Sequence, residues 1–242
     1  MSYNFFAEFY DTLMQNANYD ARAEYVLNLF KKHNKMPTLL LDLACGTGEF
    51  SKRFSLNNID VIGVDPSYEM LNIAREKLPE NLFLAQSGEE LDLFGTVDGA
   101  VCLMDSLNHI INYDNFKKAI SNVALFLEKD CLFIFDVNTE YKHKTLLADN
   151  TFVIEDENVF CTWQNSTNQN LVTNITLDFF ALTNCDTYER FCDEFSERAY
   201  TKQEIENALN SAGLEIVAIY GDLSENAPTD TEERVFYVTK KK

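Results

Sequence analysis

Acidic and glycine residues follow two apolar runs in the first third of the chain. The stretch "LLLDLACGTGEF" (39–50) places Asp42 at the end of one apolar run, with Gly46 and Gly48 shortly after it, and "VIGVDPS" ends the other run at Asp65. Glycines let a ligand approach the backbone closely. A carboxylate at the carboxyl end of a strand can accept hydrogen bonds from both hydroxyls of a ribose. The pattern therefore predicts a site for a nucleoside-bearing ligand.

The same residues restrict which nucleoside is expected. The dinucleotide fingerprint G-x-G-x-x-G is incomplete, because Ser51 occupies the third glycine position, and no G-x-x-x-x-G-K-[ST] phosphate loop occurs. Asp42 would repel a pyrophosphate but attract an ammonium or sulfonium group. The sequence thus favours a nucleoside whose other end is cationic.

These motifs resemble those of class I S-adenosylmethionine-dependent methyltransferases. The resemblance rests on "LDLACGTG" followed by "VIGVDPSYEML", "DGAVCLMDSLNHI" and "LFIFDVNT". The later stretch "ERAYTKQEIENALNSAGLEI" is similar to a bacterial subgroup of small methyltransferases related to sugar N-methyltransferases. The resemblance implies that the cofactor is S-adenosyl-L-methionine.

The resemblance also implies roles for individual residues. Asp65 binds the ribose. Ser87 stands where the family usually has an acid after the third strand, so Ser87 or the backbone of Gly88 and Glu89 contacts the adenine instead. The residues implied around the methionine part, the adenine and the methyl group are Asp42, Ala44, Gly46, Thr47, Gly48, Pro66, Met70, Met104, Asp105 and Asn108.

Three residues are candidates for catalysis. His109 could take a proton from the acceptor near neutral pH, or it could be a packing residue in its loop. Tyr10 and Tyr19 could cover the methyl group, as N-terminal aromatics do in similar enzymes, or could pack a helix onto the core.

Three residues in the later part of the chain are candidates for contact with the methyl acceptor. They are Trp163, Arg198 and Tyr200, and the alternative for Trp163 is packing at the edge of a sheet.

Composition restricts the partners and the compartment. Lys and Arg number 20 against 39 Asp and Glu, a net charge of −19, which disfavours nucleic acid and anionic membranes as partners. Six cysteines without a CxxC pair and only three histidines give no cluster with zinc-ligand spacing, so no metal is expected. No segment has the length and apolarity of a membrane span or a leader, and a cytoplasmic location is expected.

Short apolar runs alternate with helical patterns in the first part of the chain. Strands are expected at 39–43, 61–64, 82–85, 97–103 and 131–137, and helices after Asp20 as a cap and near 50–56, 67–78 and 114–127. From 152 to 200 the apolar period becomes two, which indicates antiparallel strands with "NSTNQN" as a polar turn. Thr201 and Glu204 then form a capping box before a last helix, and strands follow at 214–220 and 234–239.

The expected fold is α/β. The resemblance implies a seven-stranded, Rossmann-like, mostly parallel sheet in the order 3-2-1-4-5-7-6, with helices on both faces and an inserted antiparallel β lid. We expect residues 1–150 to form N-terminal helices and the cofactor-binding core, 151–200 the lid over the acceptor, and 201–242 the rest of the core.

The expected function is transfer of a methyl group from S-adenosylmethionine to a nitrogen or oxygen of a small molecule, by in-line displacement. A methyltransferase acting on RNA or protein is the alternative. A non-catalytic nucleoside-binding protein and an NAD-type oxidoreductase are more distant alternatives. The sequence leaves open the acceptor and the oligomeric state.

Overall fold

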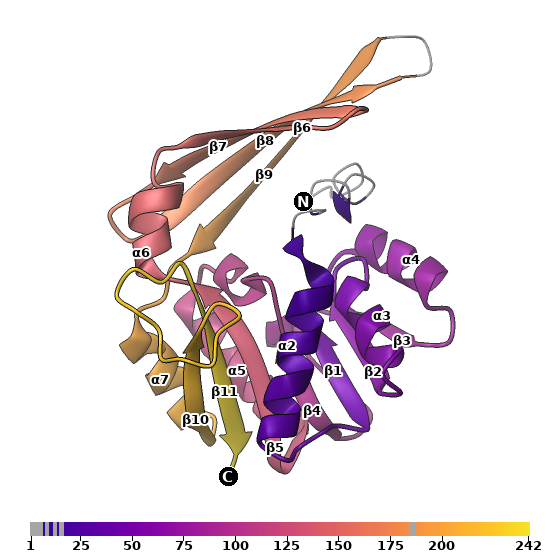
Figure 1. The fold of residues 1–242 in the computed structure, drawn as a ribbon, viewed down its shortest axis with the longest axis vertical. Helices are drawn as coiled ribbons and strands as arrows, with labels where there is room; N and C mark the ends of the chain where they lie inside the picture. Colours follow the sequence, from indigo (N-terminus) through magenta and orange to yellow (C-terminus); the bar gives the residue numbers. More distant parts are fainter. Residues whose placement is uncertain (1–6, 8–9, 12–13, 15–16, 184–186) are drawn as a thin grey trace.

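The computed structural model describes residues 7, 10, 11, 14, 17–183 and 187–242, and its centre is a seven-stranded sheet (Figure 1). The strand order is β10-β11-β5-β4-β1-β2-β3, which confirms the expected order. The strand β11 runs antiparallel to both of its neighbours, and the other pairs from β5 to β3 are parallel. The strands are β1 (Leu39–Leu43), β2 (Asp60–Asp65), β3 (Leu82–Ala85), β4 (Val97–Cys102), β5 (Leu127–Asn138), β10 (Leu214–Gly221) and β11 (Arg234–Lys241).

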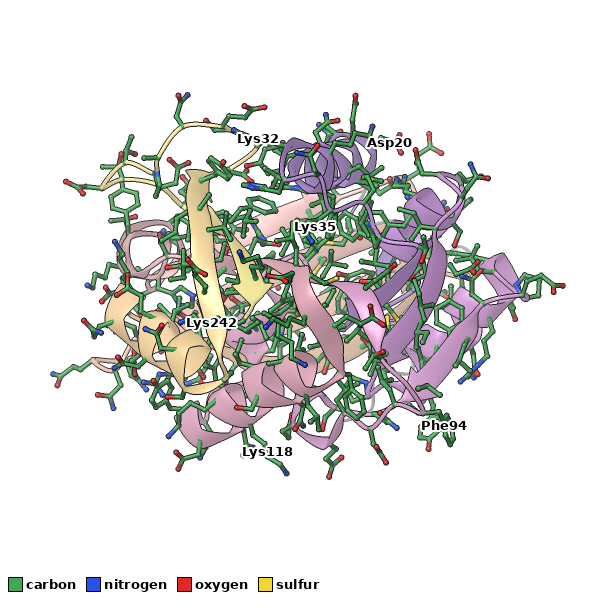
Figure 2. All side chains as sticks on the ribbon, turned by 90° about the horizontal axis from the view of Figure 1, so that it is seen from below. Asp20, Lys32, Lys35, Phe94, Lys118 and Lys242 are labelled. Atoms are coloured by element: carbon green, nitrogen blue, oxygen red, sulfur yellow. The ribbon has the colours of Figure 1, made fainter. Side chains whose placement is uncertain are left out.

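Helices cover both faces of this sheet, which explains why its central strands are continuous apolar runs. The helices α2 (Tyr19–Lys32) and α3 (Glu49–Ser55) pack on one face through a cluster that includes Phe30 and Phe54. On the other face, α5 (Tyr113–Phe126) and α7 (Lys202–Ser211) pack through a cluster that includes Phe116. Figure 2 shows α2 and α5 on opposite sides of the sheet.

The helix starts follow local capping chemistry. The helix α4 (Tyr68–Lys77) is capped by Ser67, and α7 begins with the expected capping box of Thr201 and Glu204. The expected cap Asp20 is wrong, because α2 begins after Asn18, which has left-handed backbone angles. Asp20 lies in the first turn instead, and its carboxylate accepts a hydrogen bond from Arg53 at 2.6 Å.

A second sheet follows β5 and extends away from the first one (Figure 1). It is antiparallel, in the order β6-β7-β8-β9. The strands are β6 (Thr151–Glu155), β7 (Val159–Thr167), β8 (Val172–Leu182) and β9 (Tyr188–Arg198). The expected turn "NSTNQN" is partly wrong, because β7 continues to Thr167 and the turn lies at 168–171. The amide of Asn165 is buried and donates to the carbonyl of Leu147, so this asparagine belongs to the strand.

Four short helical segments lie in the connections, the first two within the α/β core and the last two between the two sheets. They are η2 (Gly88–Glu90), η3 (Ser106–His109), α6 (Glu140–Lys142) and η4 (His143–Leu147). Within the described ranges, none of the helices has the length and apolarity needed to cross a membrane.

Candidate active site

The loop after β1 contains two glycines in left-handed conformations. Gly46 has φ +53° and Gly48 has φ +80°. A Cβ at Gly48 would lie 3.1 Å from the Cβ of Ala74 in α4, so this glycine allows close packing of the loop on α4. A Cβ at Gly46 would meet no atom within 4 Å, so Gly46 faces open space and leaves room for a ligand at the backbone.

Asp65, the last residue of β2, fixes this loop. Its Oδ2 accepts a hydrogen bond from the backbone N–H of Gly46 at 3.0 Å, and its Oδ1 accepts one from the N–H of Ser67 at 2.9 Å. A carboxylate has about four acceptor positions, so further hydroxyl donors can still bind. Burial raises the pKa of Asp65, and the two backbone N–H groups and His109 oppose that rise.

A cleft of about 520 Å³ opens at the carboxyl ends of β1, β2 and β4. Asp65 is the carboxylate of β2 in its wall, and apolar side chains such as Met70 and Pro66 lie beside it. This combination suits an aromatic base with a ribose, so the residues fit the nucleoside expected from the sequence. The predicted residues that line the cleft are Tyr10, Ala44, Gly46, Asp65, Pro66, Met70, Ser87, Gly88, Glu89 and His109.

Asp42 does not line the cleft. Its side chain lies beneath the loop with 2% exposure, and one carboxylate oxygen accepts a hydrogen bond from the Ser51 hydroxyl at 2.5 Å. Burial raises the pKa of Asp42 to about 7; Asp65 adds to the rise and Ser51 opposes it. Any attraction between Asp42 and a bound cation therefore acts through the loop and not by contact.

The other residues expected at the ligand that do not line the cleft are Thr47, Gly48, Met104, Asp105 and Asn108. Thr47 is 1% exposed, and its hydroxyl donates to Asp11 at 2.6 Å. Gly48 serves packing, as described above. Met104 packs against the cluster below α2.

The side-chain amide of Asn108 makes its hydrogen bonds within the protein, and not toward the cleft as expected. Its Nδ2 donates to the carbonyl oxygens of Asn138 and Arg198, and its Oδ1 accepts from the backbone N–H of Asn138. The residue is completely buried. Asn108 thus ties the end of β5 to the end of β9 and does not line the cleft.

The structure places the three expected acceptor residues elsewhere. The indole of Trp163 packs edge-on against Phe152, and its Nε1 donates to Asn165 within the second sheet. Arg198 pairs with Glu204 at 2.5 Å. These side chains are used in packing and ion pairing and do not line the cleft.

Tyr200 belongs to the core. It is 3% exposed and packs on Phe116, with ring centroids 4.0 Å apart, and its hydroxyl donates to the carbonyl of Ile110. The sequence could not distinguish this role from an acceptor contact. A period of two shows which side chains share a face of a strand, but it does not show which element packs on that face.

The two N-terminal tyrosines have different positions. Tyr10 lines the cleft, and burial, with help from Tyr19 and Asp105, raises the pKa of its hydroxyl well above the usual value. Tyr19 does not line the cleft, because its ring packs edge-on against Phe50 at 5.1 Å.

His109 joins the cleft to the second sheet. Its side chain is 42% exposed, and its ring stacks on Phe195 of β9 with centroids 5.2 Å apart. Its Nε2 lies 3.7 Å from Oε1 of Glu197, also on β9. Glu197 is only 4% exposed, and burial and Asp105 raise its pKa against the opposing effect of His109.

Sequence reasoning missed Glu197. The signal for it was available, because the period of two places this acid on the same face of β9 as Phe191 and Phe195. An acid on an apolar face is a candidate for a buried functional group.

A buried network supports Asp105 beside these residues. Arg234 donates to both Asp105 and Asp136, and Asn138 donates to Asp105 at 2.7 Å. The backbone N–H groups of Met104 and Asp105 both donate to Asp136, at 2.8 and 2.9 Å, and both residues have left-handed backbone angles. Although burial alone would raise the pKa of Asp105, Arg234 holds it below its usual value.

The arrangement can accept a proton next to the cleft. Asp105, His109 and Glu197 offer one atom each within 4.8 Å of one another, close enough to share a metal ion or a single polar ligand. Arg234 and Asn138 bind Asp105, and Asn138 also donates to Glu197 at 3.3 Å, so His109 is the member of this group that lines the cleft.

Comparisons with known proteins agree on one family. Residues 40–130 match a family model described as a methyltransferase domain. A relative from Geobacillus sp. (strain WCH70), named as a methyltransferase, is 32% identical over 249 residues, covering 100% of both chains. A crystal structure of an S-adenosylmethionine-dependent methyltransferase from Clostridium acetobutylicum ATCC 824 is similar with a TM-score of 0.90 and 30% identity, covering 100% of this chain and 99% of that one.

A more distant structure shares the fold. The sugar N-methyltransferase KedS8 from Streptoalloteichus sp. ATCC 53650 is similar with a TM-score of 0.80 and 20% identity, covering 95% of this chain and 90% of that one.

Proposed function

Because this chain belongs to the S-adenosylmethionine-dependent methyltransferases, we propose that it methylates a nitrogen or oxygen of a small molecule bound beside His109, with Glu197 on the other side of the imidazole. S-adenosylmethionine supplies a methyl group activated by its sulfonium. The observation that carries the proposal is the position of His109, which lines the cofactor cleft and also lies 3.7 Å from a buried carboxylate of the second sheet.

The proposed cofactor site uses the residues that line the cleft. Asp65 would accept the ribose hydroxyls, since two of its acceptor positions are taken by Gly46 and Ser67 and the others remain. Met70 and Pro66 would pack near the adenine, and Ser87 and Gly88 would contact its edge.

The acceptor is proposed to meet His109 from the side of the cleft. His109 takes the proton that an ammonium or hydroxyl acceptor must lose, and the Glu197 carboxylate stabilises the positive charge that then forms on the imidazole. Phe195, stacked on the imidazole, fixes the plane of the ring. Such alignment of reacting groups can be worth about 7–11 kcal/mol of a reaction barrier.

Three observations support a small acceptor over RNA or protein. Glu197 is 4% exposed at the junction of the two sheets, so only a small group can reach it. The net charge of −19 is unfavourable for a phosphate backbone. The name of KedS8, a sugar N-methyltransferase with the same fold, supports the same class of acceptor.

The test is transfer of labelled methyl from S-adenosylmethionine to three fractions of a cell extract: small molecules, RNA and protein. We expect label in the small-molecule fraction, and the labelled compound then serves as substrate for kinetics. His109→Asn and Glu197→Gln should each lower kcat by about 100-fold or more while S-adenosylhomocysteine binds as before. His33→Asn, at the histidine that follows the C-terminal end of α2 and does not line the cleft, is the control. Label confined to RNA or protein would refute the proposal.

A further inference from the structure

Five charged side chains form a continuous chain of ion pairs beside the cofactor cleft. Lys77 of α4 bridges Asp11 at 2.5 Å and Glu49 at 2.6 Å, and Arg53 bridges Glu49 at 2.5 Å and Asp20 at 2.6 Å. We call these residues the N-terminal clasp. Both of its ends, Asp11 and Asp20, come from the first 20 residues, and its middle comes from α3 and α4.

Asp11 also contacts the glycine loop directly. Its second carboxylate oxygen accepts a hydrogen bond from the Thr47 hydroxyl at 2.6 Å, and Thr47 stands between Gly46 and Gly48. The preceding residue, Tyr10, lines the cleft. The residue after Tyr10 is therefore bonded to the loop whose Ala44 and Gly46 line the same cleft.

The Asp20 end of the clasp is fixed on α3, through Arg53. Tyr19 packs edge-on against Phe50, and the Arg53 guanidinium lies over the Tyr19 ring at 5.3 Å from its centroid. Since α3 begins directly after the glycine loop, the N-terminal residues and the loop are held by one rigid element.

The two basic residues of the clasp stabilise the charged form of Glu49. Burial acts to raise the pKa of Glu49, but hydrogen bonds from Lys77 and Arg53 outweigh it and hold the pKa below its usual value. The side chains of Lys77 and Asp11 are 21% and 38% exposed, so water and salt reach this end of the clasp. An ion pair of this kind can open, and it weakens as the ionic strength rises.

We propose that Asp11 is a positioning residue that holds Tyr10 over the bound cofactor, and that opening of its contacts with Lys77 and Thr47 is the step that releases S-adenosylhomocysteine. The inference concerns retention of the cofactor and does not depend on the acceptor. Gating of this kind is common where a segment must close over a ligand during reaction and open for exchange.

The test measures dissociation of radiolabelled S-adenosylhomocysteine after dilution into excess unlabelled ligand. Asp11→Asn and Lys77→Met should each raise the dissociation rate about tenfold, while Lys77→Arg keeps the charge and stays near the native rate. Lys52→Met is the matched control, because Lys52 is an exposed lysine of α3 outside the clasp. Thermal unfolding of the ligand-free variants separates loss of positioning from loss of fold: the dissociation rate should change while the Tm of Asp11→Asn stays close to that of the control.

A second arm asks whether Asp11 acts through Tyr10. In a Tyr10→Leu background, the change Asp11→Asn should raise the rate no further. Added NaCl should speed dissociation from the native protein and leave Lys77→Met unaffected. Native dissociation rates in Asp11→Asn and Lys77→Met would overturn the inference, and so would fully additive effects of the two changes at Tyr10 and Asp11. Either result would leave the proposed acceptor chemistry untouched.

Discussion

Asp42 and Asp65 end neighbouring strands, but their carboxylates do different work. Asp65 borders the cleft and binds backbone N–H groups, whereas Asp42 is buried beneath the loop with its pKa raised to about 7. A group with a raised folded-state pKa changes its charge in the neutral range, so Asp42 should make both stability and cofactor binding depend on pH.

The direction of both effects follows from the protonation of Asp42. Between the unfolded value of 3.8 and the folded value of about 7, the folded protein binds the extra proton, so the contribution of Asp42 to stability is largest at low pH and falls as pH rises through 7. The charged form attracts the cationic end of the cofactor, so affinity for S-adenosylmethionine, which carries the sulfonium, should rise from pH 6 to pH 8, by up to about tenfold.

Calorimetry at pH 6, 7 and 8, with urea unfolding at the same pH values, measures both effects. At pH 8, Asp42→Asn should bind the cofactor more weakly than the native protein does. Its cofactor affinity and its stability should also vary less with pH than those of the native protein. Identical pH profiles for the two proteins would show that Asp42 is not ionised by neutral pH.

Residues of the glycine loop could be predicted from the sequence because their roles are local. Gly46 and Asp65 lie at fixed places relative to two strands, and the strands are recognisable from their apolar runs. Glu197 reaches the site only through the register of β9, and Asp11 only through Thr47 and Lys77, which are 36 and 66 positions away. Neither contact can be read from spacing along the chain.

At the scale of elements, the turn after β4 depends on β5 and β11. Met104 and Asp105 are consecutive non-glycine residues with φ of 59° and 52°. Such angles cost energy in each residue, and the two hydrogen bonds to Asp136 compensate for that cost. Arg234 of β11 in turn neutralises Asp136 and Asp105.

Substitution of Arg234 should therefore strongly lower the stability of the fold. Arg234→Met leaves two buried carboxylates without their cation, and we expect the free energy of unfolding to fall by about 3–5 kcal/mol. Arg190→Met is the control, since Arg190 is 61% exposed in its pair with Asp178 and should cost less than about 1 kcal/mol. Urea unfolding at pH 7 compares the two. Equal losses would mean that the buried pair contributes no more than an exposed one.

The elements themselves were largely predictable, and the misplaced boundaries share a cause. The strands of the first sheet were found because helices cover both faces and make the runs continuously apolar. The end of β7 was missed because Asn165 looks like a turn residue, although its side chain is buried and hydrogen-bonded to Leu147. The cap of α2 was predicted wrongly, because the carboxylate of Asp20 accepts a hydrogen bond from Arg53 and does not cap the helix. In both cases a tertiary hydrogen bond overrode a local preference.

At the scale of the whole molecule, the dominant feature is charge. With 39 acids against 20 bases, exposed acids repel one another over the surface at low ionic strength. Salt screens this repulsion, and it also screens attractive pairs such as those of the N-terminal clasp.

Repulsion should outweigh attraction, because acids are in large excess. We expect the free energy of unfolding to increase by about 1 kcal/mol between low and moderate NaCl, the scale of a few exposed ion pairs. Urea midpoints measured in a NaCl series give this value, and a KCl series controls for effects of one cation. A midpoint that decreases with salt would show that the ion pairs dominate.

The attachment of the second sheet has a mechanical consequence. This sheet is long and joined to the rest of the protein at one end, where β9 finishes at Arg198 beside η3, while its opposite end projects outward (Figure 1). It therefore behaves as a lever whose pivot lies near Glu197 and Phe195. A small rotation moves the outer tip far but shifts these two side chains little, so bending of the outer arm leaves their alignment with His109 almost undisturbed.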